Sequence, residues 1–389
     1  MKPDCKTEKG SETAPLRKPR ATNRNMHDSY CEVTLPFKSS PEFLEQYTNA
    51  SGGIRTGKIM EVLDSTAGSV AYKHLLGPEA ETVGTIQEQG FYVVTASVDR
   101  LDVLAPIYPP LRDLRLSGHV IHTGRSSMEI VVRLIGLDDG GNEESLMLGR
   151  FCMVCRDVRG GSYEVPQLTL ATPEEKELYE IGKGFRDKRQ MESRTALTRV
   201  PPTSAEAEAL HSFYLKAGQY EDGYIATPSH EAERVWMSDT TIEKSQLMFP
   251  QSRNAHSKIF GGYLMRLAYE LGFANATLFS RGPVRFLSLD KISFAKPVSI
   301  GSILRLRSTI IHSTASGKYP AIVHVRVEAN VVDVSTGLEE TTNDFRFTWV
   351  VEDGPPLSRN VVPKTYEESM LWLEGRRSLD ANPAFSGPV

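Results

Sequence analysis

Apolar residues recur at three- and four-residue spacing in two long stretches of this chain, which predicts two helices with an apolar face. The first helix is expected over about residues 57–75, and the second begins at Gly262. Four runs rich in apolar and β-branched residues follow each helix and predict strands. The expected strands are 91–102, 114–122, 127–137 and 145–156 after the first helix, and 284–293, 302–312, 321–332 and 340–351 after the second. This order, one helix followed by antiparallel strands, occurs in both halves of the chain. It predicts an α+β fold in which a curved sheet wraps round each helix.

The two halves also match each other in sequence. Residues 48–57 align without gaps with residues 253–262, and they share an Asn-Ala pair, one Ile and the final Gly. Further matching segments follow in the same order: 98–101 with 289–292, 114–116 with 304–306, and 120–123 with 310–313. Two repeats separated by a long connector indicate two similar domains rather than a solenoid, which needs at least about three units.

We expect five parts along the chain. They are a disordered tail at 1–28, the first repeat domain at 29–157, a helical connector at 158–230, the second repeat domain at 231–352, and a C-terminal helix and tail at 353–389. The first tail is polar and unpatterned, and a mitochondrial presequence is the alternative interpretation. Its acids Asp4, Glu8 and Glu12 count against a presequence, because such peptides avoid acidic residues. In the connector, capping boxes at Thr172 and Thr203 predict the starts of two helices.

Composition narrows the class of protein. The chain has 389 residues, of which 40% are hydrophobic and 24% are charged, as is ordinary for a soluble globular protein. The formal net charge of −4 gives no bulk attraction to nucleic acid, so no nucleic-acid partner is expected. No apolar run approaches the roughly 18 residues of a membrane span, so we expect no stable membrane insertion. Cys152 and Cys155 lie three residues apart on an expected strand and therefore point to opposite faces, so no metal site is expected.

Gly261 and Gly262 open the second helix. A glycine pair at a helix start lets a ligand approach the free backbone N–H groups of the first turn. These groups, together with the helix dipole, suit a polarised carbonyl oxygen or an anion. The alternative is that the pair only ends a loop tightly.

The chain resembles the double-hotdog acyl-coenzyme A thioesterases, of the acyl-coenzyme A thioesterase 9 type. The segments that carry the resemblance are 28–30, 64–65, 117–119, 124–129, 200–204 and 253–271. The resemblance covers about residues 28–352. It implies tandem hotdog domains, each an antiparallel sheet wrapped round a central helix, that pair face to face as a pseudo-dimer. It also implies a homo-oligomer, either a trimer of double hotdogs or a dimer.

The resemblance implies a catalytic acid in only one of the two repeats. Seven residues after the last Gly of each loop, the first repeat has Asp64 and the second has Tyr269. The family places an acid at this position, where a carboxylate can activate water for attack on a thioester. Asp64 is therefore the expected base. Glu270 is the rival acid, displaced by one residue and about 100° round the helix.

The loops before the helices show the opposite division. The second repeat keeps Asn254, His256, Gly261 and Gly262, whereas the first repeat has Ser51 where the His would be and Thr56 where the first Gly would be. We therefore predict one site per chain that crosses the repeat interface. The N–H of Gly262, with Gly261, would hold the carbonyl oxygen, and Asn254 would position water or thioester. His256 either braces the loop or takes part in the chemistry. Some family members have a catalytic Asn where this chain has Lys258, so the match of Asn254 is less direct.

One strand–strand turn, which contains Arg125, Ser126 and Ser127, resembles the hotdog loop that meets the pantetheine or phosphates of coenzyme A. Arginine pairs well with phosphate through a bidentate fork. Lys318 occupies the equivalent loop of the second repeat. The alternative is a solvated turn. No separate cofactor is expected, because coenzyme A is part of the substrate.

The function implied is hydrolysis of acyl-coenzyme A to a free fatty acid and coenzyme A. One alternative is a hotdog hydratase or dehydratase, which usually needs a His base near the helix start. The other is a protein that binds acyl-coenzyme A without catalysis. The resemblance implies the mitochondrial matrix, with the cytoplasm as the alternative compartment.

Overall fold

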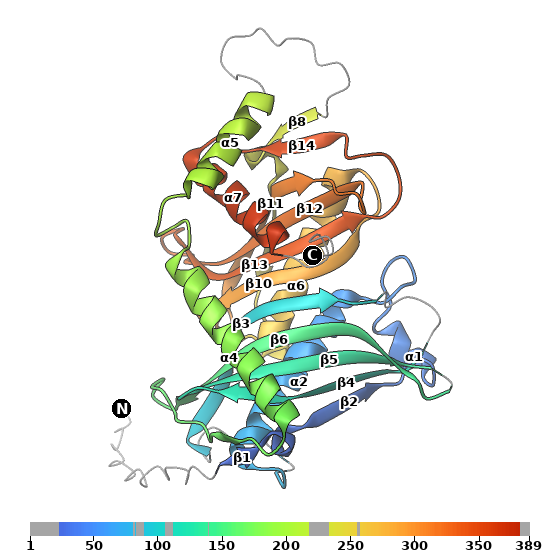
Figure 1. The fold of residues 1–389 in the computed structure, drawn as a ribbon, viewed down its shortest axis with the longest axis vertical. Coiled ribbons are helices and arrows are strands. Elements are labelled where there is room, and N and C mark those ends of the chain that lie inside the picture. The colour runs from blue at the N-terminus through green and yellow to red at the C-terminus, as the bar shows by residue number, and fades with distance from the viewer. Residues whose placement is uncertain are drawn as a thin grey trace, which may run out of the picture.

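Ten strands form one continuous antiparallel sheet that runs through both repeats (Figure 1). The structure is a computed structural model, and it describes residues 23–80, 82, 89–105, 112–138, 140–217, 233–254 and 257–381. The first repeat contributes, in spatial order, β2 (Cys31–Leu35), β4 (Leu114–Thr123), β5 (Ser127–Leu137), β6 (Glu143–Asp157) and β3 (Phe91–Val103). The second repeat continues with β10 (Arg285–Phe294), β13 (Glu339–Val351), β12 (Ala321–Val332), β11 (Ile303–Thr314) and β9 (Ile242–Leu247).

The helices and short elements complete the described part of the chain. The helices are α1 (Pro41–Glu45), α2 (Thr56–Leu76), α4 (Pro173–Arg194), α5 (Ser204–Ala217), α6 (Gly261–Ser280) and α7 (Tyr366–Asp380). Short 3₁₀ turns are η1 (Met26–Ser29), η2 (Ser238–Thr240) and η3 (Pro250–Ser252). Two small parallel pairs join β1 (Arg24–Asn25) to β7 (Leu168–Thr169) and β8 (Glu233–Trp236) to β14 (Arg359–Val362).

The hydrophobic pattern predicted the main elements well. All eight expected strands are present, with ends that differ from the prediction by no more than two residues, and both central helices start within one residue of it. The strand β9 was not predicted, because its middle residues, Glu243 to Gln246, are polar and lie on an open sheet edge.

The end of the expected N-terminal tail is ordered, which corrects its boundary. Residues 1–22 lie outside the described residues, but Arg24 begins β1 and Met26 is buried in η1. Arg24 Nε also donates a hydrogen bond to the carbonyl oxygen of His74 at the end of α2, at 3.3 Å. These contacts fix the chain before the position at which the sequence predicted order.

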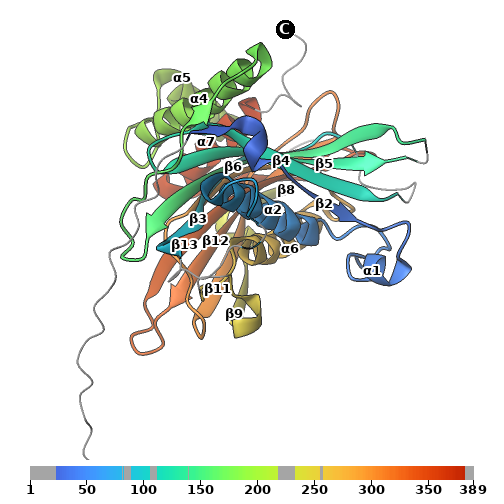
Figure 2. The same ribbon diagram turned by 90° about the horizontal axis from the view of Figure 1, so that it is seen from below.

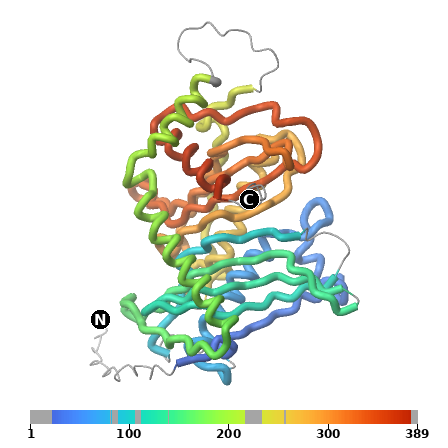
Figure 3. Tube along the Cα trace, in the orientation of Figure 1, coloured from blue at the N-terminus to red at the C-terminus, as the bar shows by residue number. Residues whose placement is uncertain are grey.

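The two repeats join edge to edge, so the face-to-face pairing expected from the resemblance is wrong. β3 and β10 are antiparallel neighbours, with Leu101 opposite Leu289 and Val98 opposite Ile292. Figure 3 shows the result, since the first repeat and the second repeat occupy separate halves of the molecule while the connector runs along one side of both. An antiparallel junction relates the two sheets by an approximate two-fold axis, which also brings α2 and α6 together.

α2 and α6 lie side by side on one face of the joined sheet (Figure 2). The first turn of each helix approaches the second turn of the other closely, because each first turn has a glycine at the contact. A Cβ placed on Gly57 would lie 3.0 Å from Arg266 Cγ, and one placed on Gly262 would lie 2.9 Å from the backbone Cα of Glu61. Any larger residue at Gly262 would therefore push the two helices apart.

α4 and α7 cover the opposite face of the sheet in equivalent positions (Figure 2). Gly182 of α4 lies directly over His122, and Gly375 of α7 lies directly over His312, so the two recurring histidines are packing residues. Arg189 of α4 forms ion pairs with two carboxylates of the sheet, the buried Glu129 and the half-buried Asp99. The connector is thus fixed across the outer face of the first repeat.

Replacing Gly182 by alanine should separate α4 from the sheet. The new Cβ would lie 2.6 Å from His122 Cβ and 3.0 Å from Ile121 Cγ1, and overpacking of this kind typically costs about 1–3 kcal/mol. Gly184, two residues away on the same helix, is the matched control, since nothing lies within 4 Å of its added Cβ. Gly184→Ala should stabilise the protein by about 0.5–1 kcal/mol through helix propensity. Thermal unfolding would measure both, and equal stabilisation by the two variants would contradict the contact.

Candidate active site

Asp64 is a buried carboxylate at the junction of the two repeats. It lies on the third turn of α2 and is 2% exposed. The hydroxyl of Thr95 on β3 donates a hydrogen bond to its Oδ1 at 2.8 Å. From the other repeat, the backbone N–H of Gly262 donates a second hydrogen bond to the carboxylate. A Cβ placed on Gly261 would lie 3.1 Å from Asp64 Oδ2, so the start of α6 touches the acid directly.

The surroundings give Asp64 a pKa suited to a general base. Burial raises the pKa of this carboxyl group to about 6, because desolvation disfavours the charged form. The hydrogen bonds from Thr95 and Gly262 act in the opposite direction and lower the pKa. Asp64 is therefore largely ionised at neutral pH and is still basic enough to take a proton from water.

Asn254 lies in the loop that leads to α6, and its described contacts are within that loop. Its Oδ1 accepts a hydrogen bond from the backbone N–H of Lys258 at 3.1 Å, and its own N–H donates to the carbonyl oxygen of Lys258 at 2.7 Å. Asn49 closes the equivalent loop of the first repeat in the same manner, with Gly53 as its partner. The matched asparagines therefore shape both loops. His256 lies outside the described residues.

The pseudo-equivalent position in the second repeat is filled by aromatic side chains. Tyr269 occupies the position of Asp64, and Phe286 occupies the position of Thr95 when the matched segments 98–101 and 289–292 are extended back. The two rings pack edge to face with centroids 5.2 Å apart, and Trp349 lies against both of them. The rival acid Glu270 forms an ion pair with Arg55 at 2.5 Å. The acid and its hydroxyl partner in the first repeat are thus both replaced by aromatic residues in the second.

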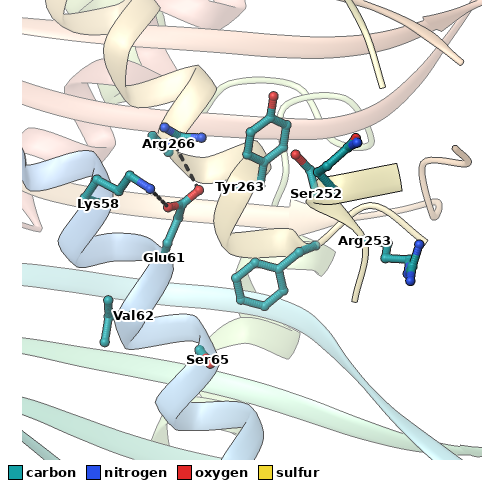
Figure 4. A pocket seen from close by; sticks show the side chains of 10 residues that line it. Lys58, Glu61, Val62, Ser65, Ser252, Arg253, Tyr263 and Arg266 are labelled. Atoms are coloured by element: carbon teal, nitrogen blue, oxygen red, sulfur yellow. Dashed lines mark ion pairs between the residues drawn. The ribbon is translucent and has the colours of Figure 1, made fainter. Parts of the chain in front are cut away.

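A pocket of about 410 Å³ opens beside Asp64, between α2 and the loop and helix of the second repeat (Figure 4). Asp64 itself does not line the pocket, but its neighbours on α2, Val62 and Ser65, do. Phe260 lines the other wall, and its ring packs against Gly262. The remaining lining residues are Lys58, Glu61, Gln251, Ser252, Arg253, Tyr263 and Arg266. The pocket therefore lies next to the turn of α2 that carries the acid.

The turn with Arg125, Ser126 and Ser127 joins β4 to β5 in the same repeat as Asp64. Its backbone is fixed, since the carbonyl oxygen of Arg125 accepts a hydrogen bond from Val165 N–H at 3.0 Å, while the Arg125 side chain is exposed. Ser127 lies opposite Val154, which lies opposite Val94, so the turn is level with Thr95 and two strands away. That distance is about 10 Å across the sheet.

Lys318 lies at the opposite end of the joined sheet from this turn. It is in the loop between β11 and β12, where its Nζ lies 5.1 Å from the centre of the Tyr319 ring. That loop is beside Arg285 at the start of β10, whereas the site is beside Ser293 near the end of the same strand. The structure therefore does not bring Lys318 to Asp64 or to Arg125.

Two residues near these sites were missed by the sequence analysis. Thr95 could have been found, because the repeat alignment sets a polar residue on β3 against Phe286. Arg186 of α4 could not, because only the fold brings it to the turn, with Nη1 3.7 Å from a Cβ placed on Gly124. Neither Arg186 nor Arg125 has an ion-pair partner among the described residues.

Metal and membrane sites have no support in the described part of the chain. No group of three or more His, Cys, Asp or Glu side chains there could hold a metal ion. Burial raises the pKa of the Cys152 thiol well above its usual value and that of Cys155 to about 12, so both remain protonated. None of the helices that the structure describes is long and apolar enough to cross a membrane.

Comparison with known proteins finds close relatives over nearly the whole chain. A bovine protein named acyl-coenzyme A thioesterase 9, mitochondrial, is 36% identical over 368 residues, which is 94% of this chain and 80% of the relative. The human protein of the same name is 34% identical over the same shares of both chains. A hop (Humulus lupulus) protein named acyl-coenzyme A thioesterase 4, mitochondrial, is 31% identical over 94% of this chain and 69% of its own. No protein-family model matches.

Replacing Asp64 by asparagine should stabilise the folded protein at neutral pH. The rise of the Asp64 pKa from 3.8 to about 6 corresponds to roughly 3 kcal/mol of unfavourable charge burial. A group whose pKa is higher when folded stabilises below its unfolded pKa, and this contribution is lost as pH rises through the folded pKa. Asp64→Asn should therefore melt above wild type at pH 7.5, and the difference should shrink toward pH 4.5. Asp187→Asn, on the exposed face of α4, is the control. A lower melting temperature at pH 7.5 would show that the ionised carboxylate is structural.

Proposed function

The chain belongs to the acyl-coenzyme A thioesterase 9 family, and on that premise we propose that it hydrolyses acyl-coenzyme A thioesters at one site that crosses its two repeats. The products are a free acid and coenzyme A. The observation that carries this proposal is the contact of buried Asp64, from the first repeat, with the N–H of Gly262, from the second. A base and an oxyanion donor in direct contact are the two groups that water attack on a thioester requires.

In the proposed mechanism Asp64 takes a proton from water, and the oxygen of that water attacks the thioester carbon. The N–H of Gly262 stabilises the negative charge that develops on the carbonyl oxygen, helped by the positive end of the α6 dipole. Collapse of the tetrahedral intermediate breaks the carbon–sulfur bond, and the proton on Asp64 passes to the departing thiolate. During these steps the hydroxyl of Thr95 keeps its hydrogen bond to Asp64 Oδ1, which is 2.8 Å long in the structure.

Substrate binding would also make the base stronger. Without substrate, the N–H of Gly262 is shared with Asp64 and lowers its pKa. A carbonyl oxygen that takes over this donor removes the hydrogen bond from the carboxylate. The pKa of Asp64 would then rise further at the moment when a thioester is in place.

Each chain should have one working site rather than two. At the second position Tyr269 and Phe286 provide no carboxylate base, and their rings pack against each other and against Trp349. Asn254 is proposed to shape the loop that presents the Gly262 N–H. The turn at Arg125, Ser126 and Ser127, with Arg186 beside it, is proposed to meet the phosphates of coenzyme A.

The relatives named above are mitochondrial proteins by name, and we place this chain in mitochondria on that resemblance. A homo-oligomer, as a trimer of double hotdogs or a dimer, remains part of the proposal. Phe273 and Leu278 on α6 are 42% and 65% exposed, and such apolar side chains could lie in a contact between copies.

Release of free thiol from a panel of acyl-coenzyme A substrates tests the function. Wild type should release thiol, and Asp64→Asn, which keeps the size of the side chain, should lower kcat by roughly a hundredfold or more, as loss of a general base does. Unchanged release by Asp64→Asn would contradict the assignment of the base. Formation of a hydrated acyl-coenzyme A without thiol would favour a hydratase, and no reaction on any chain length would favour a binding protein.

The pH dependence separates a lost base from a damaged fold. For wild type, kcat/KM should fall as pH drops below about 6, because protonation removes the base. Thr95→Val removes a hydrogen bond that lowers the pKa of Asp64, so its acid limb should move to higher pH. If the acid limb of kcat/KM had the same midpoint in Thr95→Val as in wild type, a group other than Asp64 would be titrating.

A further inference from the structure

The pocket beside Asp64 contains three cations that the proposed mechanism does not use. Lys58 and Arg266 extend from the two central helices, and Arg253 lines the edge of the pocket from the loop before α6, apart from the other two (Figure 4). Glu61 is the single acid among the lining residues. Three cations against one carboxylate leave the pocket with an excess of positive charge in a chain whose net charge is −4.

The single acid is shared between two of the three cations. Glu61 lies 3.3 Å from Lys58 Nζ through one carboxylate oxygen and 2.9 Å from Arg266 Nε through the other. Arg266 is also held by the face of the Tyr263 ring, 5.0 Å from its centre. Tyr263 is fixed in turn, because its hydroxyl accepts a hydrogen bond from Gln246 Nε2 at 2.6 Å. This wall of the pocket is therefore preorganised and partly neutralised.

Arg253 differs from the other two cations. Its backbone is anchored, since its N–H donates to the carbonyl oxygen of Pro250 and it bridges to Ile259 across the loop. Its side chain is exposed and has no ion-pair partner among the residues that the structure describes. An arginine held on a fixed loop at a pocket mouth can accept an oxyanion through its two-pronged donor face.

The position of the pocket links it to the reaction. Lys58 precedes Asp64 by six residues on one helix, which is about 9 Å along the axis. Val62 and Ser65 of the pocket wall lie within two residues of Asp64 in sequence. A group bound in the pocket and a thioester at Asp64 can thus belong to one molecule.

We propose that this pocket binds an anionic group of the substrate and that Arg253 is the main residue that contacts this group. The proposal deepens the proposed function and rests on it. The ligand chemistry is a phosphate or carboxylate oxyanion, and a thioester substrate has two sources of it. One is a phosphate of coenzyme A other than those that meet the turn at Arg125, and the other is a terminal carboxylate on a dicarboxylic acyl chain.

The test compares wild type with Arg253→Gln on three substrates that separate these sources. Butyryl-coenzyme A carries phosphates only, butyryl-pantetheine carries no anion, and glutaryl-coenzyme A carries phosphates and an acyl carboxylate. Loss of a charge-assisted contact should lower kcat/KM about tenfold, chiefly through KM. If the phosphates bind, both coenzyme A substrates lose this factor and butyryl-pantetheine does not. If the acyl carboxylate binds, glutaryl-coenzyme A alone loses it.

Two controls keep the result specific to the charge. Arg199→Gln removes an exposed arginine from the connector, far from the pocket lining, and should behave as wild type on all three substrates. Arg253→Lys should recover part of the loss, because it restores a cation without the planar fork. Unfolding temperatures should be equal, since the Arg253 side chain is exposed.

Other outcomes overturn the proposal. Equal rates for Arg253→Gln and wild type on all three substrates would show that no anion binds at Arg253. An equal loss on all three, including butyryl-pantetheine, would show that the effect does not depend on an anion. Either result leaves the proposed hydrolysis intact, whereas absence of thiol release by wild type would remove the proposed function itself.

Discussion

The close contact between the N-terminal halves of α2 and α6 is the constraint on which the site depends. Gly57 and Gly262 allow it, because a side chain on either would meet the opposite helix at about 3 Å. The edge-to-edge pairing of β3 with β10 sets the two helices in register. Only with both features in place does an N–H of one repeat reach a carboxylate of the other. The Glu61–Arg266 ion pair beside the contact links the same two helices.

Comparing the two pseudo-equivalent positions shows how the active one lowers the stability of the fold. In the second repeat Tyr269, Phe286 and Trp349 form an apolar cluster of the kind that stabilises a core. In the first repeat a carboxylate is buried at the corresponding position, and burial disfavours its charged form. One repeat thus keeps a group that burial makes reactive, while the other is free to pack well. This division explains why duplication leaves a single predicted site.

Periodicity and the internal repeat were enough to predict the helices, the eight main strands and the equivalence of Asp64 with Tyr269. The pairing of the two sheets was not predictable, because no pattern in the residues of β3 or β10 identifies the strand that each edge pairs with. Thr95 was within reach of the repeat alignment, but its contact with Asp64 depends on how β3 crosses α2. Arg186 and Arg253 depend wholly on long-range packing. Sequence reasoning therefore found the residues aligned by the repeat and missed those brought together by the fold.

A crystal structure with S-(2-oxopentyl)-coenzyme A would test the central claim most directly. This analogue keeps a carbonyl group but has a methylene between it and sulfur, so it cannot be hydrolysed as a thioester. The account predicts one analogue per chain, with its carbonyl oxygen accepting a hydrogen bond from Gly262 N–H beside Asp64. Two analogues per chain, or a carbonyl group beside Tyr269 and Gly57, would contradict it.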